Sequence, residues 1–169
     1  MLKAILYSEF DNVTGPKLVY QHPPCFLSDA VFDSISDYLI TTQELCGSII
    51  RVRASDRQVL SYPLRIEDDK YDRNALLFNV AFAFDADADV APFNPVLRKL
   101  GQQLLVLERE RGFLLTSSSR GRLPTIMRRI LVGLNESGEC AVDADYLSDA
   151  AGGAFTLHRG DGLESWRGE

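Results

Sequence analysis

Two short apolar segments at the start of the chain are separated by residues that favour a turn. Leu2–Tyr7 is apolar, the run Asp11-Asn12-Val13-Thr14-Gly15-Pro16 follows shortly after it, and Lys17–Gln21 is again extended in character. Apolar runs on both sides of an Asn/Gly/Pro turn predict a β-hairpin. The sequence His22-Pro23-Pro24 ends this hairpin, because proline cannot donate a hydrogen bond to a strand ladder.

The next segment has the periodicity of a helix. Ser28 is a favourable N-cap residue, and Phe32, Ile35 and Leu39 follow at spacings of three and four residues. Gly47 is a typical residue to follow the end of a helix. We therefore expect a helix with one buried face from Ser28 to just before Gly47.

Three further strands are predicted. Ser48–Arg53 and Arg57–Ile66 are rich in Ile, Val and Leu and flank a short polar turn, which indicates a second hairpin. After the polar run Glu67–Asn74, the segment Leu76–Phe84 alternates large apolar side chains with smaller ones and carries no charge. This pattern is typical of a central strand covered on both faces, in which the face of small residues admits a close-packed helix.

Two helices complete the pattern. Asn94-Pro95 combines a capping residue with a proline at the first helical position, and leucines at helical spacing predict a helix that continues to Gly112. A Ser117–Gly121 loop precedes a third amphipathic helix from about Leu123 to Gly138, and Phe155–Leu157 is a candidate short strand.

The order ββαβββαα predicts an α+β fold in three layers, with a mainly antiparallel sheet and helices on both faces. We expect one domain over residues 1–143, and a Gly-rich, poorly ordered tail or start of a linker over residues 144–169.

Composition and charge narrow the class of protein. The chain has 169 residues, 46% of them apolar and 25% charged, which is the composition of one globular domain. A net charge of −6 argues against a dedicated nucleic-acid-binding protein. Three scattered cysteines are typical of reduced thiols in the cytosol, and no segment approaches the ~20 apolar residues that span a bilayer. We expect a cytoplasmic protein that contacts membranes only through partners.

Motifs for an active site of its own are missing from the sequence, which has no P-loop, no G-x-G-x-x-G and no H-E-x-x-H. His22 and Cys25 are close in sequence, but the prolines between them favour a rigid loop over a catalytic pair. The run Asp85–Asp89 resembles the start of a calcium loop, yet the expected glycine is Val90 and the expected glutamate is Val96. We therefore predict no enzymatic centre, no cofactor and no metal site.

Two clusters of charged residues remain as candidates. The first consists of Arg120, Arg122, Arg128 and Arg129, which form either a solvated face or a docking patch for an acidic partner.

The second candidate is Arg73, which lies where the polar run meets the predicted central strand. An arginine projected from such a rigid base can enter a phosphate site on a neighbouring protein. The alternative is an ordinary surface network of Arg73 with Asp68, Asp69 and Asp72.

Three stretches of the sequence resemble the N-terminal longin domain of the nitrogen permease regulator 2 family. They are Ser8-Glu9-Phe10 with Thr14-Gly15-Pro16-Lys17 and Tyr20-Gln21, then Tyr71–Asn79, and then Leu134–Cys140. The likeness runs from Leu2 to Asp143. It implies a longin fold, which is a five-stranded sheet with one helix on one face and two on the other.

The resemblance also implies a function. Members of this family belong to a GATOR-type complex with a nitrogen permease regulator 3 subunit, whose longin domain forms a heterodimer with theirs, and a larger third subunit. The complex activates GTP hydrolysis by Rag GTPases and restrains TORC1 when amino acids are scarce. This implies a cytoplasmic protein held peripherally at the vacuolar or lysosomal membrane.

The family places an arginine finger in a Tyr-x-Arg-Asn motif, which corresponds here to Arg73, with Tyr71, Asp72 and Asn74 as the supporting loop. Asp72 departs from the small hydroxyl residue expected there, and the sequence leaves open whether its charge restrains Arg73 at rest. The family also has further C-terminal domains, so we expect this chain to correspond to the longin part alone. The alternative is a non-catalytic longin scaffold that forms a heterodimer and docks other subunits.

Overall fold

The computed structural model describes residues 1–40, 45–142 and 154–159, and the chain forms two compact units. The first unit contains Met1 and Lys3–Ala88, and the second contains Leu2 and the chain from Asp89 onward. Most of the tail predicted over residues 144–169 lies outside the described residues. The domain boundary at residue 143 stays a prediction.

The first unit is built on a five-stranded sheet in which every pair of neighbouring strands is antiparallel. The strands are β1 Ala4–Asp11, β2 Gly15–His22, β3 Ile50–Ala54, β4 Arg57–Glu67 and β5 Ala75–Asp85, in the order β2-β1-β5-β4-β3. Both predicted hairpins and the central position of β5 are confirmed. The expected α+β class is confirmed as well.

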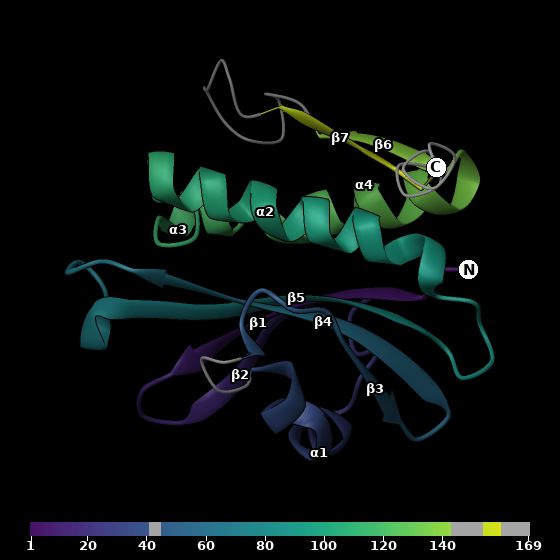
Figure 1. Ribbon diagram of the computed structural model, residues 1–169, viewed down its shortest axis with the longest axis horizontal. Coiled ribbons are helices and arrows are strands. Elements are labelled where there is room, and N and C mark those ends of the chain that lie inside the picture. The colour runs from purple at the N-terminus through teal and green to yellow at the C-terminus, as the bar shows by residue number, and fades with distance from the viewer. Residues whose placement is uncertain (41–44, 143–153, 160–169) are drawn as a thin grey trace, which may run out of the picture. The chain divides into compact units, whose positions relative to one another are not determined.

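One face of the sheet is covered by α1, Asp29–Leu39 (Figure 1). Ser28 caps this helix as predicted, since its hydroxyl oxygen accepts a hydrogen bond from the Val31 amide at 3.2 Å. Ala81 and Ala83 of β5 share one buried cluster with the apolar stripe of α1, so the face of small residues does admit a helix. The large side chains of β5 are also buried and alternate with these alanines: Phe78, Val80, Phe82 and Phe84.

The predicted end of α1 is wrong, because the helix stops at Leu39 instead of continuing toward Gly47. Ile40 has extended backbone angles (φ −119°, ψ 93°), and two β-branched threonines follow it in the sequence. The hydroxyl of Ser61 lies 3.2 Å from the Leu39 carbonyl oxygen. The sheet therefore supplies a partner for a helix-terminal carbonyl that the helix itself leaves open.

A buried polar network joins β1, β5 and β4 on the same face. The amide nitrogen of the Asn79 side chain donates to the Ser8 hydroxyl at 3.0 Å. The Asn79 side-chain oxygen lies 2.6 Å from the Ser61 hydroxyl and accepts from the Tyr62 backbone amide at 3.1 Å. Asn79, Ser8 and Ser61 are fully buried, so each polar group depends on these partners.

The second unit is mainly helical. It contains the 3-10 turn η3 Ala91–Phe93 and the helices α2 Asn94–Arg111, α3 Ser117–Arg120 and α4 Leu123–Glu136, followed by β6 Glu139–Val142 and β7 Phe155–His158. The two strands pair antiparallel, which confirms the strand predicted near residue 155. The position predicted for the two longer helices, on the second face of the sheet, stays a prediction.

Several details of this unit differ from the sequence predictions. Asn94 is not an N-cap, because η3 leads directly into α2 and gives Asn94 helical angles. The predicted Ser117–Gly121 loop contains the short helix α3, and β6 was not predicted at all because four residues carry too little pattern. Gly112 and Gly138 follow their helices with φ of +63° and +74°, as expected for C-terminal glycines.

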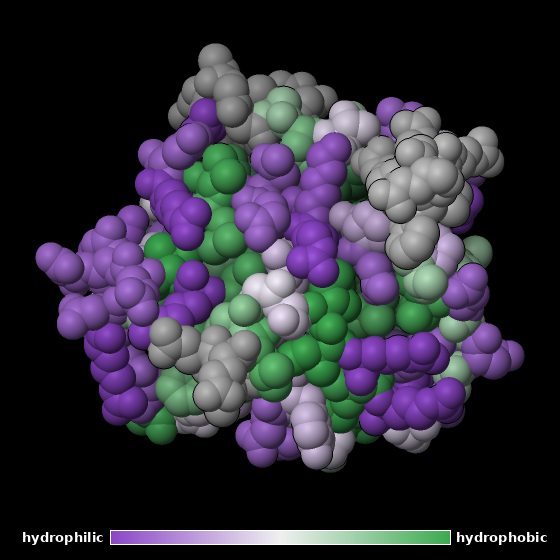
Figure 2. All heavy atoms as spheres, in the orientation of Figure 1, coloured by the Kyte–Doolittle hydropathy of each residue, from purple (hydrophilic) through white to green (hydrophobic). Residues whose placement is uncertain are grey.

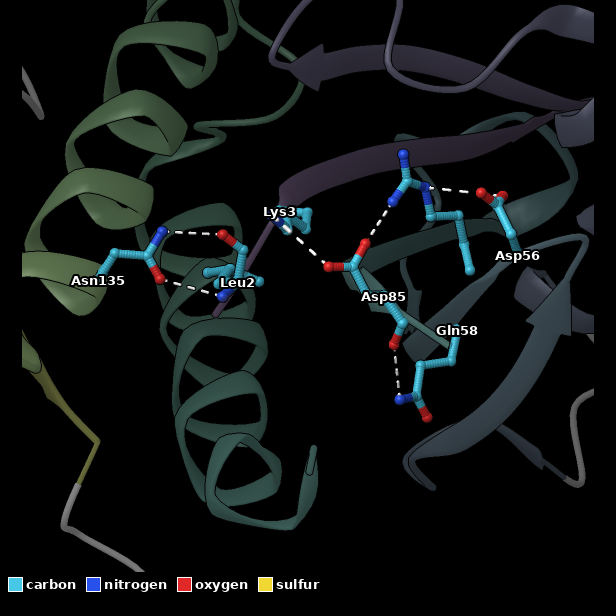
Figure 3. Close-up of polar contacts among 7 residues, drawn as sticks. Leu2, Lys3, Asp56, Gln58, Asp85 and Asn135 are labelled. Atoms are coloured by element: carbon cyan, nitrogen blue, oxygen red, sulfur yellow. Dashed lines mark hydrogen bonds and ion pairs between the residues drawn. The ribbon is translucent and has the colours of Figure 1, made fainter. Parts of the chain in front are cut away.

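The backbone of Leu2 belongs to this unit through the side chain of Asn135. The Leu2 amide donates to Asn135 Oδ1 at 3.0 Å, and Asn135 Nδ2 donates to the Leu2 carbonyl at 2.8 Å (Figure 3). The side-chain amide of Asn135 therefore satisfies both the backbone N–H and the backbone C=O of Leu2.

Strand β6 approaches α4 closely at Gly133. A Cβ atom at this position would lie 2.7 Å from the Glu139 carbonyl oxygen and 3.0 Å from Cys140 Cβ. A glycine inside a helix costs about 1 kcal/mol relative to alanine, so its use here reflects the close contact.

We predict that Gly133→Ala lowers the free energy of unfolding by about 1–2 kcal/mol. Overpacking costs about 1–3 kcal/mol and outweighs the gain of up to about 1 kcal/mol in helix propensity. Chemical denaturation measures this change, with Val132→Ala at the neighbouring exposed position as the control. A more stable Gly133→Ala variant would contradict the close contact.

We predict that Asn79→Leu lowers the free energy of unfolding by about 2–3 kcal/mol, because it removes the buried hydrogen bonds of the Asn79 side chain with the Tyr62 amide and with the Ser8 and Ser61 hydroxyls. The midpoint of urea unfolding reports the change. Adding Ser8→Ala is expected to recover part of the loss by removing one stranded hydroxyl. If Asn79→Leu alone has no effect, the network does not stabilise the sheet.

Candidate functional site

The connection between β4 and β5 is a compact turn held by its own backbone. The Asp68 amide donates to the Asn74 carbonyl at 3.0 Å, the Tyr71 amide to the Asp68 carbonyl at 3.2 Å, and the Asn74 amide to the Tyr71 carbonyl at 2.9 Å. Residues Asp72–Asn74 form the 3-10 turn η2. The candidate arginine therefore sits on a closed turn whose ends continue directly into two strands of the sheet.

Two consecutive residues of this turn have left-handed backbone angles. Arg73 has φ 56° and ψ 25°, and Asn74 has φ 60°. Asparagine adopts this conformation readily, whereas for arginine it costs about 1–2 kcal/mol. Strained backbone of this kind is concentrated at functional sites.

The four residues of the predicted motif divide into one buried and three exposed positions. Tyr71 is only 6% exposed, and Lys70 Nζ lies 5.2 Å from the centroid of its ring. Asp72, Arg73 and Asn74 are exposed. The structure thus brings the predicted residues together on one turn, with the tyrosine packed inward and the arginine side chain accessible.

The sequence left two interpretations of Arg73, a guanidinium available to a partner protein or a member of a surface network with neighbouring aspartates. Among the residues that the structure describes, Arg73 forms no ion pair with Asp68, Asp69 or Asp72. The surface network proposed as the alternative is therefore not formed within those residues. The adjacent Asp72 carboxylate likewise does not hold the guanidinium.

A hollow of about 150 Å³ lies beside Arg73. Antiparallel pairing of β1 with β5, with Glu9 opposite Phe78, brings the end of β1 to the start of β5 (Figure 1). The hollow therefore combines residues that are far apart in the sequence: Phe10, Asn12, Arg65, Asp72, Arg73, Ala75 and Leu77.

Arg65 is a second arginine in this hollow that the sequence analysis missed. Its Nη2 lies 3.2 Å from Glu67 Oε1, while its buried Nε has no hydrogen-bond partner among the described residues. Arg65 stands opposite Leu77 in the β4–β5 register, close to the start of β5. Only this register, which the sequence alone does not determine, places Arg65 near Arg73.

The turn between β1 and β2 forms the other wall of the hollow. Asp11 Oδ1 accepts hydrogen bonds from the amides of Val13 at 2.7 Å and Thr14 at 3.1 Å. These two backbone hydrogen bonds lower the pKa of the Asp11 carboxyl, so the carboxylate that holds the turn is favoured. Gly15 follows with φ +81°.

The histidines and the cysteine considered as candidates for catalysis lie in different parts of the fold. Cys25 is exposed and His22 half-buried near the end of β2, whereas His158 ends β7 in the second unit. Within residues 1–40, 45–142 and 154–159, no three His, Cys, Asp or Glu side chains lie together as a metal-binding group. None of the helices in these ranges is long and apolar enough to span a membrane.

Asp85, the first residue of the acidic run Asp85–Asp89, contacts residues at the ends of the neighbouring strands. Asp85 forms ion pairs with Lys3, at 3.6 Å, and with Arg57. The side-chain amide of Gln58 donates to the backbone oxygen of Asp85 at 2.9 Å (Figure 3). It also donates to the backbone oxygen of Ala88 at 2.7 Å. Asp85 therefore joins the ends of β1, β4 and β5.

Only two of the four arginines predicted as a cluster near the third helix line the same groove. Arg128 and Arg129 line a groove of about 470 Å³ between α4 and β6, whereas Arg120 and Arg122 do not. Glu136 and Glu139 also line the groove, so its charge is mixed. Hydrophilic residues cover much of the face seen in Figure 2, with hydrophobic side chains exposed between them. The docking patch for an acidic partner, predicted from the four arginines as the alternative to a solvated face, stays a prediction.

The sheet order β2-β1-β5-β4-β3, with α1 on one face and two long helices later in the chain, defines an α+β protein consistent with the longin-like fold. The chain belongs to the nitrogen permease regulator 2 family, whose sequence model matches residues 1–122. The resemblance noted in the sequence is thereby confirmed.

Three relatives agree with this family. The GATOR complex protein NPRL2 of Drosophila melanogaster is 38% identical over 136 residues, which cover 80% of this chain and 33% of the relative. The nitrogen permease regulator 2 homolog of Schizosaccharomyces pombe is 30% identical, over 85% of this chain and 37% of the relative. Nitrogen permease regulator 2 of Saccharomyces cerevisiae is 32% identical, over 70% of this chain and 20% of the relative. The matched part of this chain thus spans between 20% and 37% of the length of these relatives.

The left-handed conformation of Arg73 predicts that Arg73→Gly is more stable than Arg73→Ala by about 0.5–1 kcal/mol. Glycine relieves about 1–2 kcal/mol of backbone strain and loses about 0.4–1 kcal/mol through the freedom of the unfolded chain. Denaturant unfolding of both variants measures the difference. At Arg51, in the extended strand β3, the order of the same two substitutions is expected to reverse. An equal order at both positions would contradict the geometry of the turn.

Proposed function

We propose that this chain is the longin part of a GATOR-type complex subunit and that Arg73 acts as an arginine finger on Rag GTPases. The observation that carries the proposal is an exposed guanidinium on a strained, closed turn, without an ion pair among the described residues. Family membership and the GATOR name of the Drosophila relative support the partner class.

The chemistry required of the finger is electrostatic. Charge accumulates on the γ-phosphoryl oxygens of GTP as the bond to the leaving oxygen breaks, and a guanidinium brought to those oxygens neutralises it. Arginine suits this role because it is permanently charged and presents donors in a planar fork. Such fingers contribute about 10³–10⁵ in rate, or roughly 4–7 kcal/mol of barrier.

The turn supplies the positioning. Tyr71 is buried beneath the turn, and the Asn74 backbone closes it through hydrogen bonds to Asp68 and Tyr71. In the proposed mechanism Tyr71 and Asn74 hold the backbone of Arg73 in place, while only the arginine side chain moves. A positioned charge loses little conformational entropy when it enters the partner's site.

The complex supplies the remaining parts. We propose that this domain forms a heterodimer with the longin domain of a nitrogen permease regulator 3 subunit and assembles with a larger third subunit. The GTPase holds the nucleotide and its metal ion, so this chain needs no cofactor. Stimulated hydrolysis at the vacuolar or lysosomal surface then restrains TORC1 during amino-acid starvation.

We predict that Arg73→Ala, in the full-length protein within its assembled complex, reduces single-turnover GTP hydrolysis by a Rag GTPase about 10³-fold or more, toward the intrinsic rate. Assembly is expected to remain intact, because the Arg73 side chain is exposed. Arg73→Lys is expected to recover little of the rate, since an ammonium lacks the planar fork. Arg109→Ala, an exposed arginine on α2, is the control.

Full stimulation by an assembled Arg73→Ala complex would contradict the finger. That result would leave the scaffold interpretation, in which the domain only forms the heterodimer and docks other subunits.

A further inference from the structure

We infer that the β1–β2 turn, Phe10–Thr14, and Arg73 form one surface that docks the GTPase, with Val13 as its apolar contact. This inference rests on the proposed function and adds a binding element to it. We call the turn residues Phe10–Thr14 the hairpin contact.

The hairpin contact exposes apolar side chains to solvent. Val13 is 92% exposed, which exceeds the exposure of every other large hydrophobic side chain in the described part of the chain. Phe10, at the base of the same turn, is 37% exposed and lines the hollow beside Arg73. Apolar side chains presented together at an exposed turn favour contact with a partner, because binding removes their surface from water.

Rigidity is the second argument. The Asp11 carboxylate accepts hydrogen bonds from the amides of both Val13 and Thr14, which holds the apex in one conformation. The turn also continues into the paired strands β1 and β2, with Asp11 opposite Gly15. A partner that binds a preorganised apex has little conformational entropy to remove.

Position is the third argument. Asn12 of the hairpin contact lines the same hollow as Arg73 and Arg65. Phe10 and Asn12 therefore lie beside two guanidinium groups, with Val13 next to Asn12 in the chain, and the Arg65 Nε has no hydrogen-bond partner among the described residues. This combination fits a partner surface that carries an apolar patch next to an anionic group. A GTPase with its triphosphate bound offers the anionic group where the proposed finger must enter.

The division of roles is specific. Arg73 would act on the rate of the chemical step, whereas Val13 would act on the affinity for the GTPase. Contacts that are equal in the ground state and the transition state change the half-saturating concentration and leave the maximal rate unaltered.

The test uses the full-length protein in its assembled complex and varies the concentration of GTP-loaded Rag GTPase. We expect Val13→Ser to raise the concentration for half-maximal stimulation about tenfold, with the maximal rate unchanged. Val13→Leu is expected to keep the wild-type value. Val106→Ser, at an exposed valine of α2, is the matched control and is expected to have no effect.

Equal half-saturating concentrations for Val13→Ser and Val106→Ser would overturn the inference. A reduced maximal rate with unchanged half-saturation would overturn it too, because it would assign the turn to positioning instead of binding. Direct binding to Rag GTPase loaded with a non-hydrolysable GTP analogue gives an independent reading. If Arg73→Ala keeps the full rate while Val13→Ser weakens binding, the finger fails and the hairpin contact stands.

Discussion

Pairing of β5 on both edges is the constraint on which the first unit depends. Residues 78–84 of this strand are buried, and their backbone groups depend on the neighbouring strands, since β1 pairs with residues 78–83 and β4 with residues 75–85. Asn79 adds side-chain hydrogen bonds to both neighbours, through Ser8 on β1 and Ser61 on β4. The same register brings the end of β1 and the residue Arg65 to the start of β5, where the candidate site lies.

Charged side chains of this unit occur in two different settings. Asp85 is neutralised by Lys3 and Arg57, and these contacts join the ends of three strands. Arg73 is at the opposite end of β5, exposed, and without such a partner among the described residues. Pairing within the fold favours the charged form of Asp85, whereas the role proposed for Arg73 requires a side chain that stays accessible.

Rigidity and exposure are combined at both turns that border the hollow. The turn that carries Arg73 is closed by backbone hydrogen bonds and has a buried tyrosine beneath it, while the β1–β2 turn is held by the Asp11 carboxylate. Each presents an exposed side chain, Arg73 or Val13, from a fixed backbone. The left-handed angles of Arg73 are a cost that the surrounding sheet can support.

Local pattern determined much of this protein from the sequence alone. The alternation in β5, the turn residues of the hairpins and the cap at Ser28 each act over a few neighbouring residues, so most of the elements were predictable. The motif Tyr71–Asn74 was singled out by its likeness to the family and not by a local pattern. Tertiary structure decided the rest. Helix α1 ends at Leu39 where Ser61 meets its last carbonyl, and Gly133 is a glycine because β6 comes close. Arg65 and Asn12 reach Arg73 only through strand register, which long-range pairing sets and no local pattern encodes.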